Sequence, residues 1–162
     1  MPPYKGKFTP DNPSKYMGDA DNIIYRSGWE RRAMKYFDIN PGVLKWASEE
    51  VVIQYYDSVS KKVRRYFPDF LIKVQTAEGS TQTHLIEVKP SKDLRPPTSG
   101  RGKKKSTVLY EMKTYRMNQD KFAAARKWCD DRNIIWDVWT CLLYNPDAAD
   151  ELTRASLYYS PS

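Results

Sequence analysis

Apolar residues recur with helical spacing in the segment that starts at Ser27 and ends near Asp38. The apolar positions three or four residues apart are Trp29, Ala33, Tyr36 and Phe37. This spacing places them on one face of a helix, and the helix-breaking sequence Asn-Pro-Gly follows at 40–42. The pattern therefore predicts a first helix over residues 27–38.

Three strands are predicted in the segment that follows. Residues 51–56 and 65–74 are rich in β-branched and aromatic side chains, and the turn-like sequence DSVSKK between them predicts antiparallel pairing. A second turn at 77–80, with the sequence AEGS, leads to a third strand at 84–89. Successive side chains of this strand are expected to point to opposite faces of the sheet.

A long helix and one more strand complete the pattern. Residues 107–131 contain neither proline nor glycine, and the sequence IIWDVWT at 134–140 predicts a further strand. A short helix is expected after Tyr144, before an aromatic tail. The order of elements, helix, three strands, helix and strand, predicts an α/β fold in which helices flank a central mixed sheet.

The composition narrows the possible function classes. The chain has 162 residues, 40% of them hydrophobic, and its 27 basic and 20 acidic residues give a formal net charge of +7. These values fit one folded domain. No apolar run is long enough to span a membrane, and one histidine with two cysteines cannot form a structural zinc site. Phosphate-binding glycine motifs and the serine-hydrolase motif are also missing from the sequence.

Charge and proline content divide the chain into three predicted segments: an extended N-terminal arm at 1–22, a domain at 23–144, and a C-terminal helix and tail at 145–162. Within the domain, residues 91–106 hold six basic residues and one acid, and their prolines and glycines predict a flexible loop. Such a loop either solubilises the surface or contacts a polyanion; its length and its place after an acidic strand favour a polyanion. Its candidate DNA contacts are Lys92, Arg101, Lys103, Lys104 and Lys105.

Two carboxylates and a lysine are placed for phosphodiester chemistry. Asp69 opens a predicted strand behind Pro68, and Glu87 and Lys89 share one face of the next strand. If these strands pair, Asp69 and Glu87 approach closely enough to bind Mg²⁺, or Mn²⁺ in its place. Lys89 would then orient the nucleophile and stabilise charge on phosphorus. The alternative is a turn aspartate and an exposed Glu87–Lys89 ion pair, but charged residues are unusual in a central strand.

Glu30 in the first helix is a further candidate carboxylate, although the sequence from Ser27 to Glu30 equally fits a capping box. Arg26 and Ser27 lie one turn before Glu30 and are candidates for phosphate contact. Glu49 and Glu50 are expected only to cap or orient a helix.

These residues also carry a resemblance to a known family. The sequences YFPDF at 66–70 and IEVKP at 86–90 resemble the PD...(D/E)xK motif of the restriction-endonuclease-like nucleases, and Glu30 in YRSGWER matches the helix glutamate of many members. The ordered segments up to about Trp139 resemble the head completion nucleases of T4-like tailed bacteriophages. Similar motifs occur in TnsA-type transposon endonucleases and archaeal Holliday junction resolvases.

The resemblance implies a Mg²⁺-dependent DNA endonuclease that finishes the DNA-filled phage head by trimming DNA ends. It implies that Asp69, Glu87 and Glu30 bind the metal and that Lys89 assists the nucleophile. The implied partners are double-stranded DNA and portal or neck proteins of the phage. The implied place of action is the host cytoplasm during assembly, or the virion head or neck if the protein is retained there.

Gln119 and Lys121 fall in the second predicted helix, where related nucleases often place a polar contact to phosphate; a solvated helix face is the alternative. Two other functions remain open. One is a structural protein that binds DNA or the portal without turnover, a role that the aromatic tail would suit. The other is a recombination or transposition endonuclease, which would need a partner to recognise sequence because this chain resembles no sequence-reading module.

Overall fold

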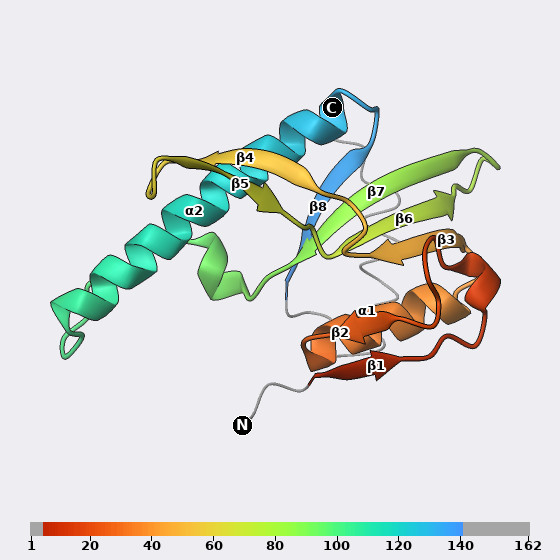
Figure 1. Cartoon of the computed structure of the whole chain (residues 1–162), viewed down its shortest axis with the longest axis horizontal. Coiled ribbons are helices and arrows are strands. Elements are labelled where there is room, and N and C mark those ends of the chain that lie inside the picture. Colours follow the sequence, from red (N-terminus) through yellow and green to blue (C-terminus); the bar gives the residue numbers. More distant parts are fainter. Residues whose placement is uncertain (1–4, 141–162) are drawn as a thin grey trace.

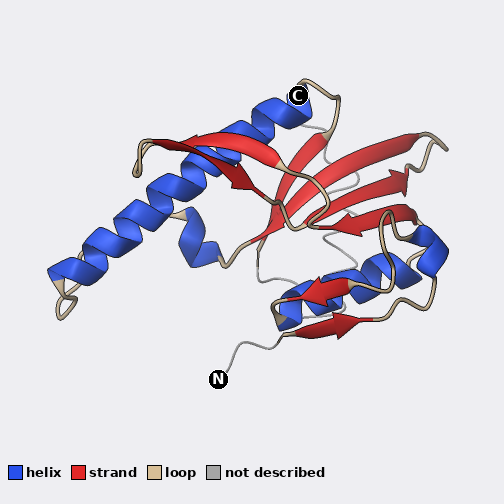
Figure 2. Cartoon of the chain, in the orientation of Figure 1, coloured by secondary structure: helices blue, strands red, loops and turns tan. Residues whose placement is uncertain are grey.

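A mixed four-stranded sheet forms the centre of the computed structural model, which describes residues 5–140 (Figure 1). The elements are β1 (Gly6–Phe8), η1 (Pro13–Lys15), β2 (Ile23–Tyr25), α1 (Gly28–Ile39), β3 (Val43–Ser48), β4 (Ile53–Asp57), β5 (Lys62–Tyr66), β6 (Phe70–Gln75), β7 (Thr81–Val88), η2 (Ser91–Leu94), α2 (Lys105–Asp130) and β8 (Ile135–Trp139). The predicted α/β architecture is confirmed. Both long helices and the strand after the second of them lie where the sequence pattern placed them (Figure 2).

The strand order of the central sheet is β3-β6-β7-β8. The first three strands run antiparallel, whereas β8 pairs in parallel with β7 after the chain crosses over through α2. Strand β7 therefore has a hydrogen-bonded neighbour on each side. The turn between β6 and β7 lies where it was predicted, and Gly79 there adopts a left-handed φ of +83°.

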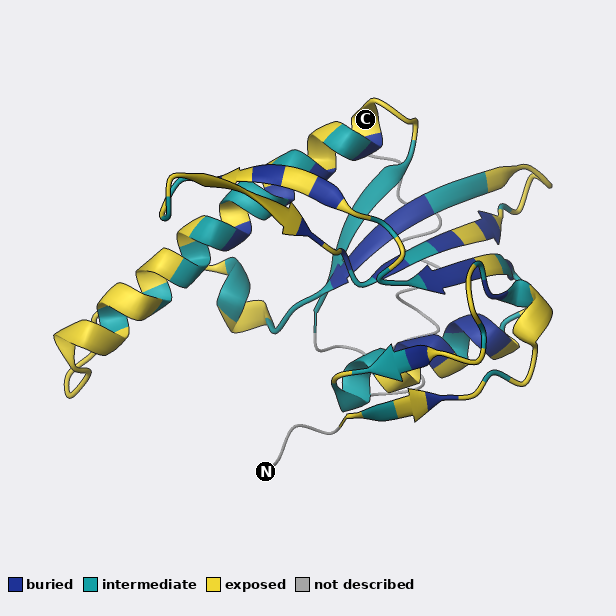
Figure 3. Ribbon diagram, in the orientation of Figure 1, coloured by how far each residue is buried: buried dark blue, intermediate teal, exposed yellow. Residues whose placement is uncertain are grey.

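Each face of the sheet is covered by one helix, and buried residues line both interfaces (Figure 3). Ile86 and Val88 of β7 pack in the cluster that contains Phe37 of α1. Leu85 belongs instead to the cluster that contains Ala125 of α2. The predicted alternation of side chains along this strand is confirmed, and apolar layers on both faces fix its position.

The prediction of one continuous strand at 65–74 is wrong. The structure divides this segment between β5 and β6, which belong to different sheets. β5 pairs with β4 in a two-stranded hairpin, while β6 joins the central sheet. Pro68 stands at the break, where its missing N–H prevents a continuous ladder. β3, which pairs with β6, was not predicted at all.

The predicted arm at 1–22 packs on the domain wherever the structure describes it. The rings of Phe8 and Tyr16 meet Trp46 of β3 edge to face, with centroids 5.8 and 4.7 Å apart. The ammonium group of Lys15 donates hydrogen bonds of 2.7–2.9 Å to the carbonyl groups of Phe37, Asp38 and Asn40. These bonds cap the C-terminus of α1. The boundary at residue 22 does not separate two packing units.

The predicted basic loop is shorter than expected, because η2 occupies its start and α2 already begins at Lys105. The N-terminal half of α2 extends away from the central sheet and is largely exposed (Figures 1 and 3). The helix and tail predicted at 145–162 lie outside the described residues. Within residues 5–140, no helix is both long and apolar enough to cross a membrane.

Candidate active site

Asp69 and Glu87 lie side by side at one end of the central sheet. Phe70 is paired with Ile86, so the residues that flank this pair, Asp69 and Glu87, face each other across the two strands. The Val88 amide donates a 2.7 Å hydrogen bond to Oδ2 of Asp69. The approach of the two carboxylates that was expected from strand pairing is therefore present in the structure.

Glu87 is 5% exposed and has two side-chain partners. The Tyr66 hydroxyl, at the end of β5, donates a 2.7 Å hydrogen bond to Oε2 of Glu87. The ammonium group of Lys89 lies 3.2 Å from Oε1. The backbone of Lys89 is fixed in turn, because its amide donates to the Trp139 carbonyl of β8 at 2.9 Å.

The electrostatics of the carboxylate pair fit a cation. Burial first, and then the charge of Glu87, raise the pKa of Asp69 to about 8, although the Val88 hydrogen bond and Lys89 act in the opposite direction. One lysine thus compensates only part of the negative charge that two ionised carboxylates would place here. The carboxylates of Asp69 and Glu87 are hard oxygen donors whose negative charge is only partly neutralised, which is the kind of ligand pair that suits a divalent cation such as Mg²⁺.

Glu30 does complete a capping box at the start of α1. Its backbone amide donates to Ser27 Oγ at 3.1 Å, and its carboxylate accepts from the Ser27 hydroxyl and the Arg26 amide. Burial raises the pKa of Glu30. Glu30 and Lys89 also line the same cavity of about 970 Å³, between the start of α1 and the end of β7.

The three predicted carboxylates do not meet at one point. Among residues 5–140, no three histidine, cysteine, aspartate or glutamate side chains are gathered closely enough to hold one metal ion. The charge of Glu30 nevertheless raises the pKa of Asp69. Direct ligation by Glu30 stays a prediction, and the structure assembles only Asp69 and Glu87.

Arg26 and Ser27 have protein partners in the structure. The guanidinium of Arg26 makes two 3.1 Å hydrogen bonds to the carboxylate of Glu49, and Ser27 is engaged in the capping box. Glu49 follows strand β3 and has a left-handed φ of +54°, so it does not cap a helix. Its amide donates to the Asp69 carbonyl at 3.1 Å, a contact that spacing along the sequence could not reveal.

Of the two polar residues predicted in the second helix, only Lys121 reaches the site. Its ammonium group lies 5.5 and 5.9 Å from the ring centres of Tyr66 and Tyr55. Burial lowers the pKa of Lys121, and the nearby charge of Lys89 lowers it further. Gln119 is exposed on the same helix.

The basic residues of the 91–106 segment that were predicted to contact DNA lie in η2, in the loop that follows it and at the start of α2. Lys92 and Lys103 line a cavity of about 520 Å³ between the loop and α2, and Lys103 is ion-paired with Glu111 at 2.6 Å. Arg101, Lys104 and Lys105 are exposed. An α-helix rises about 1.5 Å per residue, so Lys105 lies roughly 24 Å along α2 from Lys121.

Two comparisons relate this chain to known nucleases. A family model described as TnsA-like endonuclease N terminal matches residues 40–141. The head completion nuclease of Enterobacteria phage T4 is 37% identical over 140 residues, which cover 85% of this chain and 91% of that protein. The range matched by the family model contains Asp69, Glu87 and Lys89, whereas Glu30 precedes it.

Proposed function

This chain belongs to the TnsA-like endonuclease family, which makes it a DNA endonuclease, and on that premise we propose how it cleaves. Cleavage depends on a divalent cation, Mg²⁺ or Mn²⁺, held by the carboxylates of Asp69 and Glu87. The chain then follows the PD-(D/E)xK pattern of the restriction-endonuclease-like nucleases. The observation that carries this proposal is the pairing of two carboxylates beside Lys89 at the end of the sheet.

The protein residues have separate tasks in this mechanism. Asp69 and Glu87 supply the cation's oxygen ligands, and Tyr66 holds Glu87 in orientation through its hydroxyl group. When bound, the cation supplies Lewis acidity toward the phosphate. Lys89 donates hydrogen bonds to oxygen atoms of the attacking water or the scissile phosphate, and so stabilises negative charge that two carboxylates alone would repel.

Glu30 is proposed as a fourth, positioning member of the site. It lines the same cavity as Lys89, and its charge acts on Asp69. From this position its carboxylate reinforces the negative potential that attracts the cation, while its contacts to Ser27 and Arg26 hold the start of α1.

The biological role proposed for this activity is completion of the phage head by trimming DNA ends. Its support is the similarity to the T4 head completion nuclease over most of both chains. Contact with portal or neck proteins, and action in the host cytoplasm during assembly, stay predictions.

A plasmid-nicking assay tests the proposed chemistry. The wild-type protein should nick plasmid DNA with Mg²⁺ or Mn²⁺ and lose this activity in EDTA. Asp69→Asn and Glu87→Gln should abolish nicking, and Lys89→Ala should abolish it while leaving DNA affinity nearly unchanged. Activity equal to wild type in Asp69→Asn or Glu87→Gln would show that the site lies elsewhere.

A further inference from the structure

A groove of about 540 Å³ lies between the β4–β5 hairpin and α2. Arg64, Arg65 and Phe67 line it from the hairpin side, and Met117 and Lys121 line it from the helix. Its volume falls in the range that encloses a small organic ligand. None of the residues that line it is acidic.

Two of its three cations have no acidic partner among the described residues. Arg64 is paired with Asp57 at 3.0 Å. Within residues 5–140, neither Arg65 nor Lys121 forms an ion pair. The groove therefore offers a positive surface suited to phosphate oxygens.

An aromatic ring completes the groove. Phe67 is 42% exposed, although it stands only two residues before the largely covered Asp69. The guanidinium of Arg65 lies 5.9 Å from the centre of this ring. Exposed aromatic rings next to basic side chains are typical of surfaces on which unpaired bases stack while cations hold the backbone.

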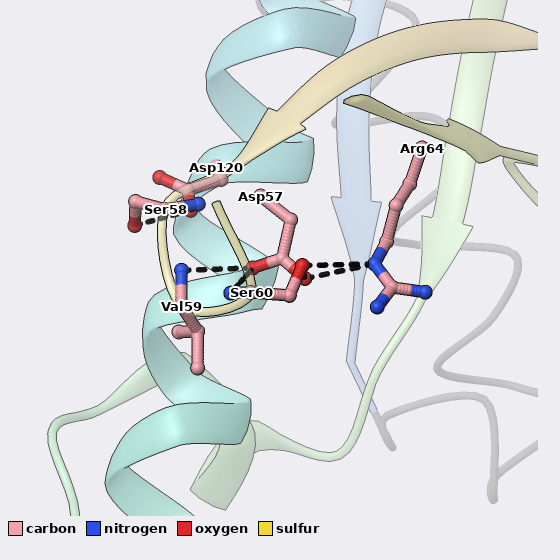
Figure 4. Close-up of polar contacts among 6 residues, drawn as sticks. All are labelled: Asp57, Ser58, Val59, Ser60, Arg64 and Asp120. Atoms are coloured by element: carbon pink, nitrogen blue, oxygen red, sulfur yellow. Dashed lines mark hydrogen bonds and ion pairs between the residues drawn. The ribbon is translucent and has the colours of Figure 1, made fainter. Parts of the chain in front are cut away.

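The walls of the groove are held in place by a network at the hairpin turn (Figure 4). The Asp57 carboxylate accepts hydrogen bonds from Val59 and Ser60 and pairs with Arg64. Asp120 of α2 accepts from both the amide and the hydroxyl group of Ser58, at 2.9 and 2.7 Å. These contacts fasten the turn to the helix, so the groove is formed before any ligand binds.

Residues in and next to the groove are linked to the catalytic end of the sheet. Tyr66 joins the hairpin to Glu87, and Phe67 and Pro68 lead directly to Asp69. The charges of Lys89 and Glu87 both act on Lys121. The groove and the carboxylate pair are therefore neighbours.

We propose that this groove binds an unpaired nucleotide of the substrate strand next to the scissile phosphate. Arg65 and Lys121 contact its phosphates, and its base stacks on Phe67. This inference rests on the proposed nuclease function and adds the form of the substrate: a DNA end that carries a single-stranded stretch. In an intact duplex both faces of each base are already stacked, and freeing one costs energy.

The test compares DNA binding in Ca²⁺, without cleavage, for a blunt duplex and for the same duplex with a single-stranded overhang. The wild-type protein should prefer the overhang. Phe67→Ala should weaken overhang binding by about fivefold to 150-fold, the effect of losing one stacked base, and leave duplex binding unchanged. Phe67→Leu should weaken overhang binding as Phe67→Ala does, and Phe67→Trp should keep overhang binding at the wild-type level.

Two further variants make the test specific. Arg65→Ala should flatten the salt dependence of overhang binding by about 0.7, the value for one phosphate contact on a single strand. Tyr56→Ala removes an aromatic ring of the hairpin that is 56% exposed and lies outside the groove, and it should change the binding of neither substrate. Equal weakening of both substrates by Phe67→Ala, or wild-type binding by Phe67→Leu, would overturn the proposal.

Measuring cleavage and overhang preference separately distinguishes a wrong groove assignment from a wrong catalytic assignment. Asp69→Asn should keep the overhang preference while losing cleavage. Cleavage by Asp69→Asn would overturn the catalytic assignment without affecting the groove, whereas wild-type cleavage without an overhang preference would overturn only the groove.

Discussion

The Tyr66 hydroxyl donates a 2.7 Å hydrogen bond to Oε2 of Glu87, and this contact joins the β4–β5 hairpin to the catalytic strand. Burial and the charge of Glu87 raise the pKa of Tyr66, which favours the neutral hydroxyl that donates this hydrogen bond. With Lys89 on its other oxygen, Glu87 is oriented from two directions.

Tyr66→Phe should therefore impair the site without removing any proposed ligand. The loss of one partner from a buried acceptor should lower the free energy of unfolding by about 1–3 kcal/mol. The Mg²⁺ concentration for half-maximal nicking should rise by about 10-fold to 100-fold, because Glu87 is no longer held in orientation. Tyr56→Phe, an exposed tyrosine of the same hairpin, is the control, and a matching result in both variants would contradict the role of Tyr66.

The stability of the metal-free protein should fall as the pH rises from about 5 to 8. Burial and Glu87 raise the pKa of Asp69 to about 8, so the folded protein keeps a proton that the unfolded chain releases near pH 4. Across that window the native state binds more protons, and the free energy of unfolding declines by at most about 1.4 kcal/mol per pH unit. Thermal unfolding in EDTA measures the effect.

Asp69→Asn is the matched variant for this pH series. Its pH dependence should be flatter, and at pH 8 in EDTA it should be more stable than wild type because the buried charge is gone. Mg²⁺ at pH 8 should raise the Tm of the wild type and not that of the variant. Parallel pH curves for the two proteins would show that Asp69 is not the titrating group.

Substitutions of Glu30 should separate its capping role from its charge. Glu30→Ala loses the capping box and should lower the free energy of unfolding by about 0.3–1.5 kcal/mol. Glu30→Gln keeps a capping side chain, so it should unfold like wild type yet nick DNA at least about tenfold more slowly, a loss of about 1.4 kcal/mol of transition-state stabilisation. A Glu30→Gln variant with wild-type nicking would leave Glu30 a purely structural role.

Neutralising Lys103, Lys104 and Lys105 should weaken DNA binding without affecting the cleavage chemistry. Lys103 is paired with Glu111, so only the other two lysines are free to contact phosphates. The salt dependence of duplex binding should flatten by about 1.8, at about 0.9 per contact, with no change in sequence preference. An unchanged slope would mean that this end of α2 faces solvent or a protein partner.

Periodicity predicted the elements whose apolar positions repeat strongly. The first helix was placed within a residue or two because Ser27 caps it and Asn40 ends its apolar stripe. The spacing of Glu87 and Lys89 also predicted their shared face, since side chains alternate in any strand. Local rules of this kind depend only on neighbours along the chain.

The features that sequence did not reveal are long-range contacts. Nothing local shows that the chain changes sheets at Pro68, or that Tyr66 turns back toward Glu87. Glu49 reaches Asp69 through its backbone amide, which carries no signal in residue type. Pro68 was the one available clue, because a proline inside a predicted strand argues against a continuous ladder.

The parallel pairing of β7 with β8 also sets the order in which the site can be completed during synthesis. Residues 84–88 leave the ribosome long before their partners at 135–139. Until β8 emerges, the strand that carries Glu87 is an open edge, and the Lys89 amide has no Trp139 carbonyl to bind. A nascent chain that stops before β8 thus holds an unfinished catalytic strand, and the finished nuclease forms only when translation of the domain is nearly over.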